Sequence, residues 1–447
     1  MNLFGTDGIR GRCGQFPLDN TTLQKIGFAL SKHTKNTVKN IYLAHDGRES
    51  SESIIDNLLK GLLYERDFKI IYLGLFPTPA IPTILSTIDN KDSVGIQITA
   101  SHNPYSDNGI KIFNELGYKL SSHDEKEINN LVEKCNNFDS ANKIKLVVDT
   151  KSRNNYINHL LKFYKKNKTY NKNLRIAVDC SNGALSEVIS ELNLGEGINL
   201  EIFNFTPNGK NINQKCGSTY PTFLKNIITN KNRENIDSSD FIDFGISFDG
   251  DGDRSIVISD SGKILDGDEQ LLLLATQGTK KIKKVVGTKM TNFGIRREFM
   301  DSEIKFIETD VGDKYVLTEI IKNDYEIGSE SSGHIIHTDS ASIPIGDALI
   351  TLIKFIHLCQ SSDKSIDDLY PSNKKYPSKL INIETNNSEK FISDNEQIFI
   401  KLRELFLDHG RILIRKSGTQ SMVRILLEHK NNEVILQAES LLDKILK

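Results

Sequence analysis

Short apolar segments rich in β-branched residues alternate with amphipathic helical stretches through the first part of the chain. Residues 41–44, 70–73 and 94–96 are predicted to be buried strands, with room for a helix between them. A similar strand at residues 175–179 opens a second unit, and residues 256–258 are expected to open a third. Strands that alternate with helices in this way are typical of α/β domains.

The pattern changes at about residue 371, where two strands flanked by helical stretches predict a smaller α+β domain. A chain of 447 residues is also too long for one typical domain. We therefore expect three related α/β domains with mixed sheets, followed by a smaller C-terminal α+β domain. The predicted domains are residues 1–152, 153–254, 255–368 and 369–447.

Charge and composition exclude several classes of partner. The net charge of −2 argues against a nucleic-acid-binding surface. The N-terminus lacks a signal pattern, and no apolar run approaches the roughly 20 residues of a membrane span. Five scattered cysteines without a Cys-x-x-Cys pair predict reduced thiols. We expect a cytoplasmic protein with no nucleic-acid and no membrane partner.

Residues 99–111 place a serine, a turn and a lysine in one short segment. Ser101 follows a predicted strand, and the asparagine, proline and glycine residues after it are turn signals. A serine hydroxyl needs activation before it acts as a nucleophile. Lys111 or a metal ion can supply it, whereas the adjacent His102 is disfavoured because neighbouring side chains usually diverge. A purely structural turn is the alternative.

Residues 247–254 carry three aspartates, Asp249, Asp251 and Asp253, at alternate positions between glycines. A tight loop of this kind can turn three carboxylates onto one ion, and hard oxygen ligands suit Mg²⁺ or Ca²⁺ better than zinc. An EF-hand is disfavoured, because Asp260 stands where the closing glutamate belongs. An acidic surface turn is the alternative, but we favour a metal site.

A C-terminal segment, residues 415–421, combines two cations, hydroxyl groups and a glycine, and Arg424 follows it. Arg415 can hold a phosphate bidentately, and the main chain of residues 417–419 can offer N–H donors. The alternative is a plain β-turn between two strands. The segment is not a P-loop, which argues against an ordinary nucleotide triphosphatase.

Two further segments hold candidate binding groups. In residues 328–334, Glu330 can accept hydrogen bonds from sugar hydroxyls, Ser332 can donate or accept, and His334 can carry a proton near neutral pH. In residues 4–11, three glycines surround Arg10, which indicates a loop close to an anionic group. An ordinary turn is the alternative for this N-terminal segment.

The serine loop, the Asp-x-Asp-x-Asp loop, the Glu-x-Ser-Gly-His loop and the Arg-x-Ser-Gly-Thr loop occur in this order. Together they resemble the α-D-phosphohexomutase superfamily over the whole chain. Residues 4–11, 207–213 and 216–219 are similar to its bacterial phosphoglucosamine mutase branch. The chain departs from the family pattern at five positions in the last two loops: Ser329, Ser331, Lys416, Gln420 and Ser421.

The resemblance implies an active site in the central cleft where four domains meet. It implies that Ser101 carries a phosphoryl group and holds Mg²⁺ together with Asp249, Asp251 and Asp253. The phosphoryl group would pass to glucosamine 6-phosphate to form bound glucosamine 1,6-bisphosphate. The other phosphate would then return to Ser101 and leave glucosamine 1-phosphate, which feeds the synthesis of UDP-N-acetylglucosamine and cell-wall precursors.

The resemblance also assigns the remaining residues. The catalytic set is Ser101, Lys111, Arg10, His102, Arg254 and His334; the substrate-binding set is Glu330, Ser332, Arg415, Ser417, Gly418, Thr419 and Arg424. The expected partner is a small-molecule hexosamine phosphate, and the sequence leaves a homodimer open. The alternatives are a phosphoglucomutase or phosphomannomutase, or a catalytically silent sugar-phosphate-binding protein. A serine hydrolase is disfavoured because no His-Asp pair is evident beside Ser101.

Overall fold

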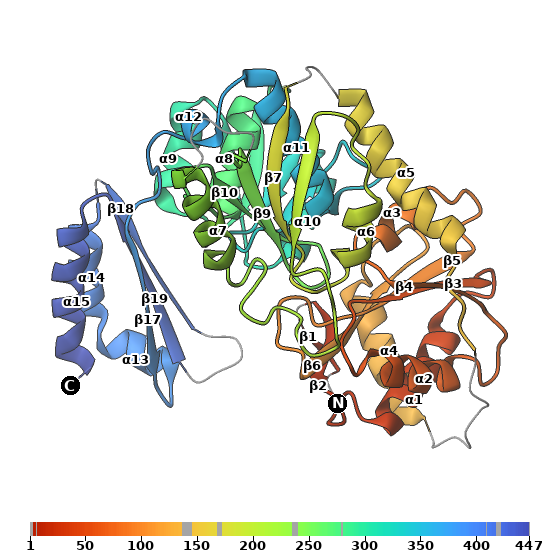
Figure 1. Cartoon of the computed structure of the whole chain (residues 1–447). Helices are drawn as coiled ribbons and strands as arrows, with labels where there is room; N and C mark the ends of the chain where they lie inside the picture. Colours follow the sequence, from red (N-terminus) through yellow and green to blue (C-terminus); the bar gives the residue numbers. More distant parts are fainter. Residues whose placement is uncertain are drawn as a thin grey trace. The chain divides into compact units, whose positions relative to one another are not determined.

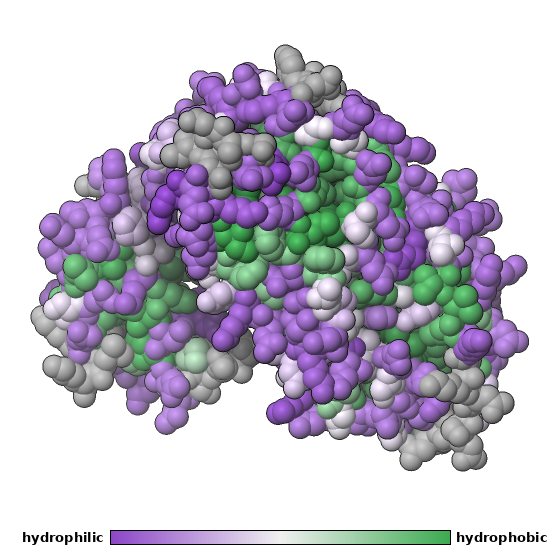
Figure 2. Space-filling model, viewed as in Figure 1, coloured by the Kyte–Doolittle hydropathy of each residue, from purple (hydrophilic) through white to green (hydrophobic). Residues whose placement is uncertain are grey.

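A computed structural model of the chain describes residues 3–5, 7–135, 145–167, 172–234, 240–278, 280–407, 409–416 and 422–446. They form two compact units (Figure 1), the first made of Met1–Lys289 and Ile307–Pro371 and the second of Met290–Phe306 and Ser372–Lys447. Among the described residues, every helix is too short or too polar to cross a bilayer. Hydrophilic residues cover much of the face seen in Figure 2, with apolar residues between them.

The first sheet has six strands in the order β1-β2-β6-β5-β3-β4. Their bounds are β1 Phe4–Gly5, β2 Gly8–Arg12, β3 Asn40–His45, β4 Lys69–Leu75, β5 Ser93–Ile98 and β6 Asp107–Phe113. The sheet is mixed, because β3 is parallel to β4 and β5 whereas β6 is antiparallel to β5 and β2. The turn between β5 and β6 contains Ser101, at the end of a strand as the sequence predicts.

Helices α1 Asn20–His33, α2 Ser51–Leu62, α3 Ala80–Ser86 and α4 Ser122–Lys134 accompany this sheet. Leucine and isoleucine side chains of α1 and α2 form one apolar core with β3, β5 and β6. Helices α1 and α2 approach so closely that a Cβ at Gly61 would lie 1.8 Å from the carbonyl oxygen of Gln24. Glycine is therefore required at this crossing.

The second sheet has the order β11-β10-β9-β7-β8. Its strands are β7 Leu174–Asp179, β8 Ile198–Phe203, β9 Phe244–Phe248, β10 Ser255–Ser259 and β11 Ile264–Leu265, with helices α5 Thr150–Asn167, α6 Leu185–Glu191 and α7 Thr222–Glu234. Leu224 and Ile228 of α7 pack on Ala177 of β7 and Ile258 of β10. The expectation that residues 256–258 open a third unit is wrong. The short aspartate loop returns the chain directly, so that β10 pairs antiparallel with β9 in the second sheet.

The third sheet has the order β13-β12-β14-β15-β16. Its strands are β12 Lys284–Thr288, β13 Lys305–Thr309, β14 Ile327–Ser329, β15 Ile335–His337 and β16 Ile345–Gly346. Helices α8 Gly267–Gln277, α10 Asp313–Asn323, α11 Ala348–Ser362 and α12 Ile366–Leu369 belong to the same part of the chain. The turn between β14 and β15 carries Glu330 and His334.

The second unit contains the antiparallel sheet β17-β19-β18, with β17 Ser378–Glu384, β18 Gly410–Lys416 and β19 Met422–His429. Its helices are α9 Phe293–Asp301, α13 Ser388–Asp394, α14 Glu396–Leu405 and α15 Asn432–Leu446. Phe399 of α14 and Leu442 of α15 pack on Val423 and Ile425 of β19. The prediction of two strands missed β17, whereas the fold class of three α/β domains with mixed sheets and a smaller C-terminal α+β domain is confirmed.

Candidate active site

Ser101 is fully buried, and its side chain faces the aspartate loop. Its Oγ donates a hydrogen bond to Oδ2 of Asp249 at 2.7 Å and lies 3.4 Å from Nδ1 of His102. Burial, together with the charges of Arg254 and Arg10, lowers the pKa of His102 to about 4. His102 is therefore neutral near pH 7, and its Nδ1 accepts from the Nη1 of Arg254 at 3.1 Å.

The β9–β10 loop places three buried carboxylates together, those of Asp249, Asp251 and Asp253. One oxygen from each lies within 4.8 Å of the others. The Nζ of Lys111 is 2.8 Å from Oδ2 of Asp251 and 2.8 Å from Oδ2 of Asp253. Burial lowers the pKa of Lys111, but the nearby carboxylates outweigh it and raise this pKa well above its usual value. The lysine therefore stays charged.

The carboxylate cluster fits a divalent cation. The Oδ1 atoms of Asp251 and Asp253 are buried and have no hydrogen-bond partner among the described residues. Burial, reinforced by Asp253 and Asp251, raises the pKa of Asp249 well above its usual value. Three buried carboxylates therefore converge on one place and keep oxygen atoms without a hydrogen bond. Oxygen donors of this kind suit hard divalent cations such as Mg²⁺ and Ca²⁺.

Charged residues that the sequence analysis missed extend this cluster. The Nζ of Lys119 lies 2.5 Å from Oδ1 of Asp7 and also bonds Asp313, while Lys111 is 3.3 Å from Asp7. His334 is 3.7 Å from Asp253 and 3.9 Å from Asp313. The result is a closed ring of alternating acidic and basic side chains, in the order Asp253, Lys111, Asp7, Lys119, Asp313 and His334. Burial lowers the pKa of His334, but Asp253 and Asp313 outweigh this effect and raise it.

Two arginines complete the surroundings of Ser101. Arg10 donates to Oδ2 of Asp7 at 2.6 Å and to the carbonyl oxygen of Ala100 at 3.3 Å. Burial lowers the pKa of Arg254, but the charges of Asp253 and Asp249 outweigh it, and the net shift is upward. The structure thus brings all six predicted catalytic residues together in the first unit: Arg10, Ser101, His102, Lys111, Arg254 and His334.

The predicted sugar loop occupies the turn between β14 and β15. Oε1 of Glu330 accepts from the main-chain N–H of Gly312 at 2.9 Å, and burial raises the pKa of Glu330. Ser332 is exposed at the tip of the turn. Ser331, one of the departures from the family pattern, donates to Oδ1 of Asp268 in the first turn of α8 at 2.9 Å.

In the second unit, Arg415 of β18 and Arg424 of β19 are directly opposed across the sheet. Like charges in opposed positions destabilise a sheet unless an anion lies between them. The Nε of Arg424 is buried without a hydrogen-bond partner among the described residues. Lys416 pairs with Glu389. The other predicted phosphate-loop residues, Ser417, Gly418 and Thr419, lie outside the described residues, as do Gln420 and Ser421.

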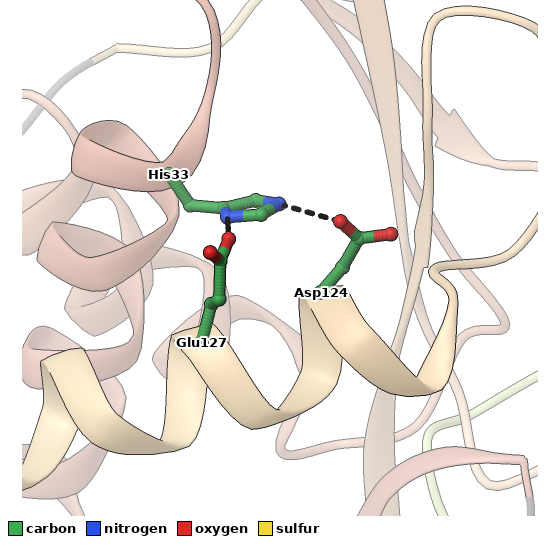
Figure 3. Close-up of side chains that lie close together, drawn as sticks. All are labelled: His33, Asp124 and Glu127. Carbon is green, nitrogen blue, oxygen red and sulfur yellow. Dashed lines mark ion pairs between the residues drawn. The ribbon is translucent and has the colours of Figure 1, made fainter.

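A second group of potential metal ligands lies between α1 and α4 (Figure 3). The Nε2 of His33 is 3.4 Å from Oδ1 of Asp124, and its Nδ1 is 3.1 Å from Oε2 of Glu127. The two carboxylates thus approach different ring nitrogens, which point in different directions. One ligand atom from each residue lies within 4.8 Å of the others, but each carboxylate already contacts its own ring nitrogen, and the group links α1 to α4.

Family models of phosphoglucomutase/phosphomannomutase match the chain in four consecutive parts. Those of alpha/beta/alpha domains I, II and III match residues 1–138, 154–262 and 266–376, and the C-terminal domain matches residues 380–442. A phosphoglucomutase/phosphomannomutase family protein of Burkholderia thailandensis has the same fold, with a TM-score of 0.78 at 19% identity over 100% of this chain and 97% of that one. The four family models, together with the fold and the site, therefore place the chain in the class of phosphohexomutases.

Sequence relatives refine this class. A phosphoglucosamine mutase of Acinetobacter baumannii is 36% identical over 97% of this chain and 96% of its own length. One of Fusobacterium nucleatum is 33% identical over 97% of this chain and 96% of its own. The N-acetylphosphoglucosamine mutase of Aspergillus fumigatus shares the fold, with a TM-score of 0.64 at 17% identity over 100% of this chain and 96% of that one. The chain belongs to the phosphoglucosamine mutase family.

Proposed function

We propose that the protein interconverts glucosamine 6-phosphate and glucosamine 1-phosphate through a phosphorylated Ser101. The contact between the Ser101 hydroxyl and a buried, lysine-linked aspartate triad carries this proposal. The choice of glucosamine as the sugar rests on relatives that are named phosphoglucosamine mutase and are 33–36% identical to this chain. A free hexosamine phosphate is the proposed partner, and a cytoplasmic location and a homodimer remain predictions.

We assign one Mg²⁺ to Asp249, Asp251, Asp253 and the phosphate of Ser101. When bound, the ion neutralises charge on the phosphoryl group in transfer. The Oδ1 atom of Asp251, buried without a hydrogen-bond partner among the described residues, supports this assignment. The Oδ1 atom of Asp253 has only longer contacts, at 3.7 Å to His334 and to Arg254. Lys111 neutralises two of the carboxylates, and its raised pKa favours an electrostatic role over that of a base.

The proposed reaction has two phosphoryl transfers. In the first, a sugar hydroxyl loses its proton and forms a bond to phosphorus while the bond from phosphorus to Oγ of Ser101 breaks. This yields bound glucosamine 1,6-bisphosphate. In the second, Oγ of Ser101 takes the other phosphate and the sugar oxygen regains a proton. His334, next to Asp253 and Asp313, is placed to hold a proton, while Arg10 and Arg254 add positive charge around Ser101.

We assign substrate binding to two loops. Glu330 and Ser332 would hold sugar hydroxyls, and Gly312 already orients the Glu330 carboxylate. The opposed pair Arg415 and Arg424 would bind the phosphate that is not in transfer, which relieves their mutual repulsion. The proposed phosphate-binding set also contains Ser417, Gly418 and Thr419.

The Ser101→Ala variant tests this proposal. Purified wild-type protein should carry phosphate on Ser101, detectable by mass spectrometry, and should form the 1-phosphate of glucosamine in the presence of Mg²⁺. Ser101→Ala should lose the phosphate and drop to background turnover, while Ser190→Ala, at an exposed hydroxyl of α6, should match the wild type. Mutase turnover in Ser101→Ala comparable to that of the wild type would refute the phosphoserine mechanism.

A further inference from the structure

Arg48 lies just beyond β3, and its side chain is completely buried. The Nε of Arg48 donates to Oδ2 of Asp46 at 2.8 Å. Its two Nη atoms donate to four main-chain carbonyl oxygens of the serine loop: those of Ser101 (2.8 Å), Asn103 (3.0 Å), Pro104 and Asp107 (2.9 Å). An arginine has five N–H donors. Four of them therefore hold one loop, and the fifth holds a neutralising carboxylate.

The carboxylate of Asp46 is also linked to the main-chain N–H of Ser101, through the hydroxyl of Thr99. Thr99 donates its hydroxyl to Oδ2 of Asp46 at 2.6 Å, and the main-chain N–H of Ser101 donates to Oγ1 of Thr99 at 2.8 Å. Both main-chain polar groups of Ser101 are thus fixed by one buried ion pair, the N–H through Asp46 and the carbonyl through Arg48.

Ser101 needs such support, because its φ of +54° is a left-handed conformation that side-chain-bearing residues rarely adopt. Conformations of this kind persist only where the surrounding structure fixes them. Asn213, from the loop after β8, adds a second donor to the Ser101 carbonyl at 2.9 Å. The aspartate loop comes so close that a Cβ at Gly250 would lie 2.6 Å from this oxygen.

We propose that Arg48 and Asn213 are positioning residues that clamp the Ser101 main chain, so that its Oγ keeps one orientation through both phosphoryl transfers. This inference rests on the proposed function. Both side chains bond the Ser101 carbonyl oxygen, and neither bonds its Oγ. Phosphoryl transfer depends mainly on in-line positioning and charge neutralisation. A displacement of about 1 Å at such a centre costs about 100-fold in rate.

The substitution Arg48→Lys tests the clamp, because it keeps the charge beside Asp46 and removes the planar fork of donors. The chain offers a matched control in Arg66, whose Nη atoms donate to four carbonyl oxygens in the last turn of α1 and the segment after it: Ser31 (2.8 Å), Thr34 (2.7 Å), Lys35 (3.2 Å) and Val38 (3.3 Å). Arg66→Lys therefore makes the same chemical change in a segment that holds none of the proposed site residues.

We expect kcat of Arg48→Lys to fall about 100-fold with little change in KM, and kcat of Arg66→Lys to stay at the wild-type value. In single turnover of the phosphorylated protein, the ratio of phosphate lost to water to phosphate transferred to the sugar should be higher in Arg48→Lys than in the wild type or in Arg66→Lys. Asn213→Ala removes one donor and should change both quantities in the same direction by about 10-fold, since one of two donors remains.

The outcomes separate the two claims. Wild-type protein without mutase activity overturns the proposed function and this inference with it. An active wild type with an equally active, folded Arg48→Lys overturns the inference alone. If thermal unfolding shows that Arg48→Lys is not folded, Asn213→Ala decides, because wild-type kcat and an unchanged loss of phosphate to water in that variant overturn the clamp.

Discussion

The Oγ of Ser101 donates a 2.7 Å hydrogen bond to Oδ2 of Asp249, although 148 positions separate the two residues in the chain. The contact joins the β5–β6 turn of the first sheet to the β9–β10 loop of the second. A phosphate on Ser101 would therefore stand next to the three carboxylates. Such a concentration of negative charge requires a cation, so phosphorylation and metal binding should depend on each other.

Asp251→Asn should weaken metal binding and turnover together, because it removes a charged ligand whose second oxygen has no protein partner. Loss of a residue that only supports a metal ligand lowers metal affinity by about 10–100-fold. Loss of the ligand's own charge should lower the apparent affinity for Mg²⁺ by at least as much. Turnover measured against Mg²⁺ concentration checks this, with the exposed Asp67→Asn as the control. An unchanged Mg²⁺ dependence would mean that the aspartate loop is only a structural turn.

Thr78 supports the same ligand, since its Oγ1 donates to Oδ2 of Asp251 at 2.5 Å. Thr78→Val keeps the shape of the side chain and removes the donor, so metal affinity should fall by about 10–100-fold. Thr78→Ser keeps the hydroxyl and should restore most of the affinity. Isothermal titration with Mg²⁺ measures both variants, and equal affinities for Val and Ser at this position would contradict the assignment.

Asp347 caps α11 and accepts from Tyr156 at 3.0 Å, and burial raises its pKa to about 6. The folded protein thus binds this proton more tightly than the unfolded chain, whose pKa is 3.8. The resulting stability is complete below pH 3.8 and is lost as pH rises through about 6, a loss of about 3 kcal/mol at most.

Asp347→Asn keeps a good N-cap without a charge, so it should raise the free energy of unfolding above pH 6 and flatten its pH dependence. Urea unfolding from pH 4 to pH 8 measures this. Tyr156→Phe removes a hydrogen bond that lowers the Asp347 pKa, and should move the transition to higher pH. Identical pH profiles for wild type and Asp347→Asn would rule the assignment out.

Lys119 links Asp7 to Asp313. Lys119→Met removes a cation that two carboxylates share: Asp7 keeps Arg10 and Lys111, whereas Asp313 keeps only His334, at 3.9 Å. The variant should lower the free energy of unfolding by about 2–3 kcal/mol. This is less than the about 3–5 kcal/mol typical of breaking a fully buried pair, because the lysine is partly exposed and Asp7 keeps its other partners. Adding Asp313→Asn should restore part of the loss, since it removes the carboxylate that has lost its nearest cation. Urea unfolding of the single and double variants gives the coupling free energy between Lys119 and Asp313. Strictly additive effects would argue against an interaction between these two residues in the ring.

Local chemistry made the central loops predictable. Ser101 follows a β-branched strand and precedes turn residues, and alternate aspartates between glycines predict the group of three buried carboxylates that the structure shows. The assignment of strands to sheets is harder to predict from the sequence. Residues 256–258 had the composition of a new unit's first strand, but only the antiparallel pairing of β10 with β9 shows that they complete the second sheet.

The missing parts of the site depend on contacts between distant positions. Lys119 meets Asp313 across 194 positions, and Thr78 meets Asp251 across 173. Arg48 lies in the loop after β3, where the local sequence gives no sign of a role. Its role can be inferred only from its carbonyl partners, which lie more than 50 positions away in the chain. No periodicity or spacing in the sequence reports such pairs.

Phosphorus NMR of the phosphorylated protein with Mg²⁺ tests the central claim most directly. Separate samples would receive glucosamine 6-phosphate, glucose 6-phosphate or mannose 6-phosphate, and the appearance of each 1-phosphate would be followed. We predict that glucosamine 1-phosphate forms fastest, together with a phosphoserine signal that Ser101→Ala lacks. Faster conversion of glucose or mannose would contradict the proposed substrate, and no conversion despite phosphoserine would contradict mutase activity itself.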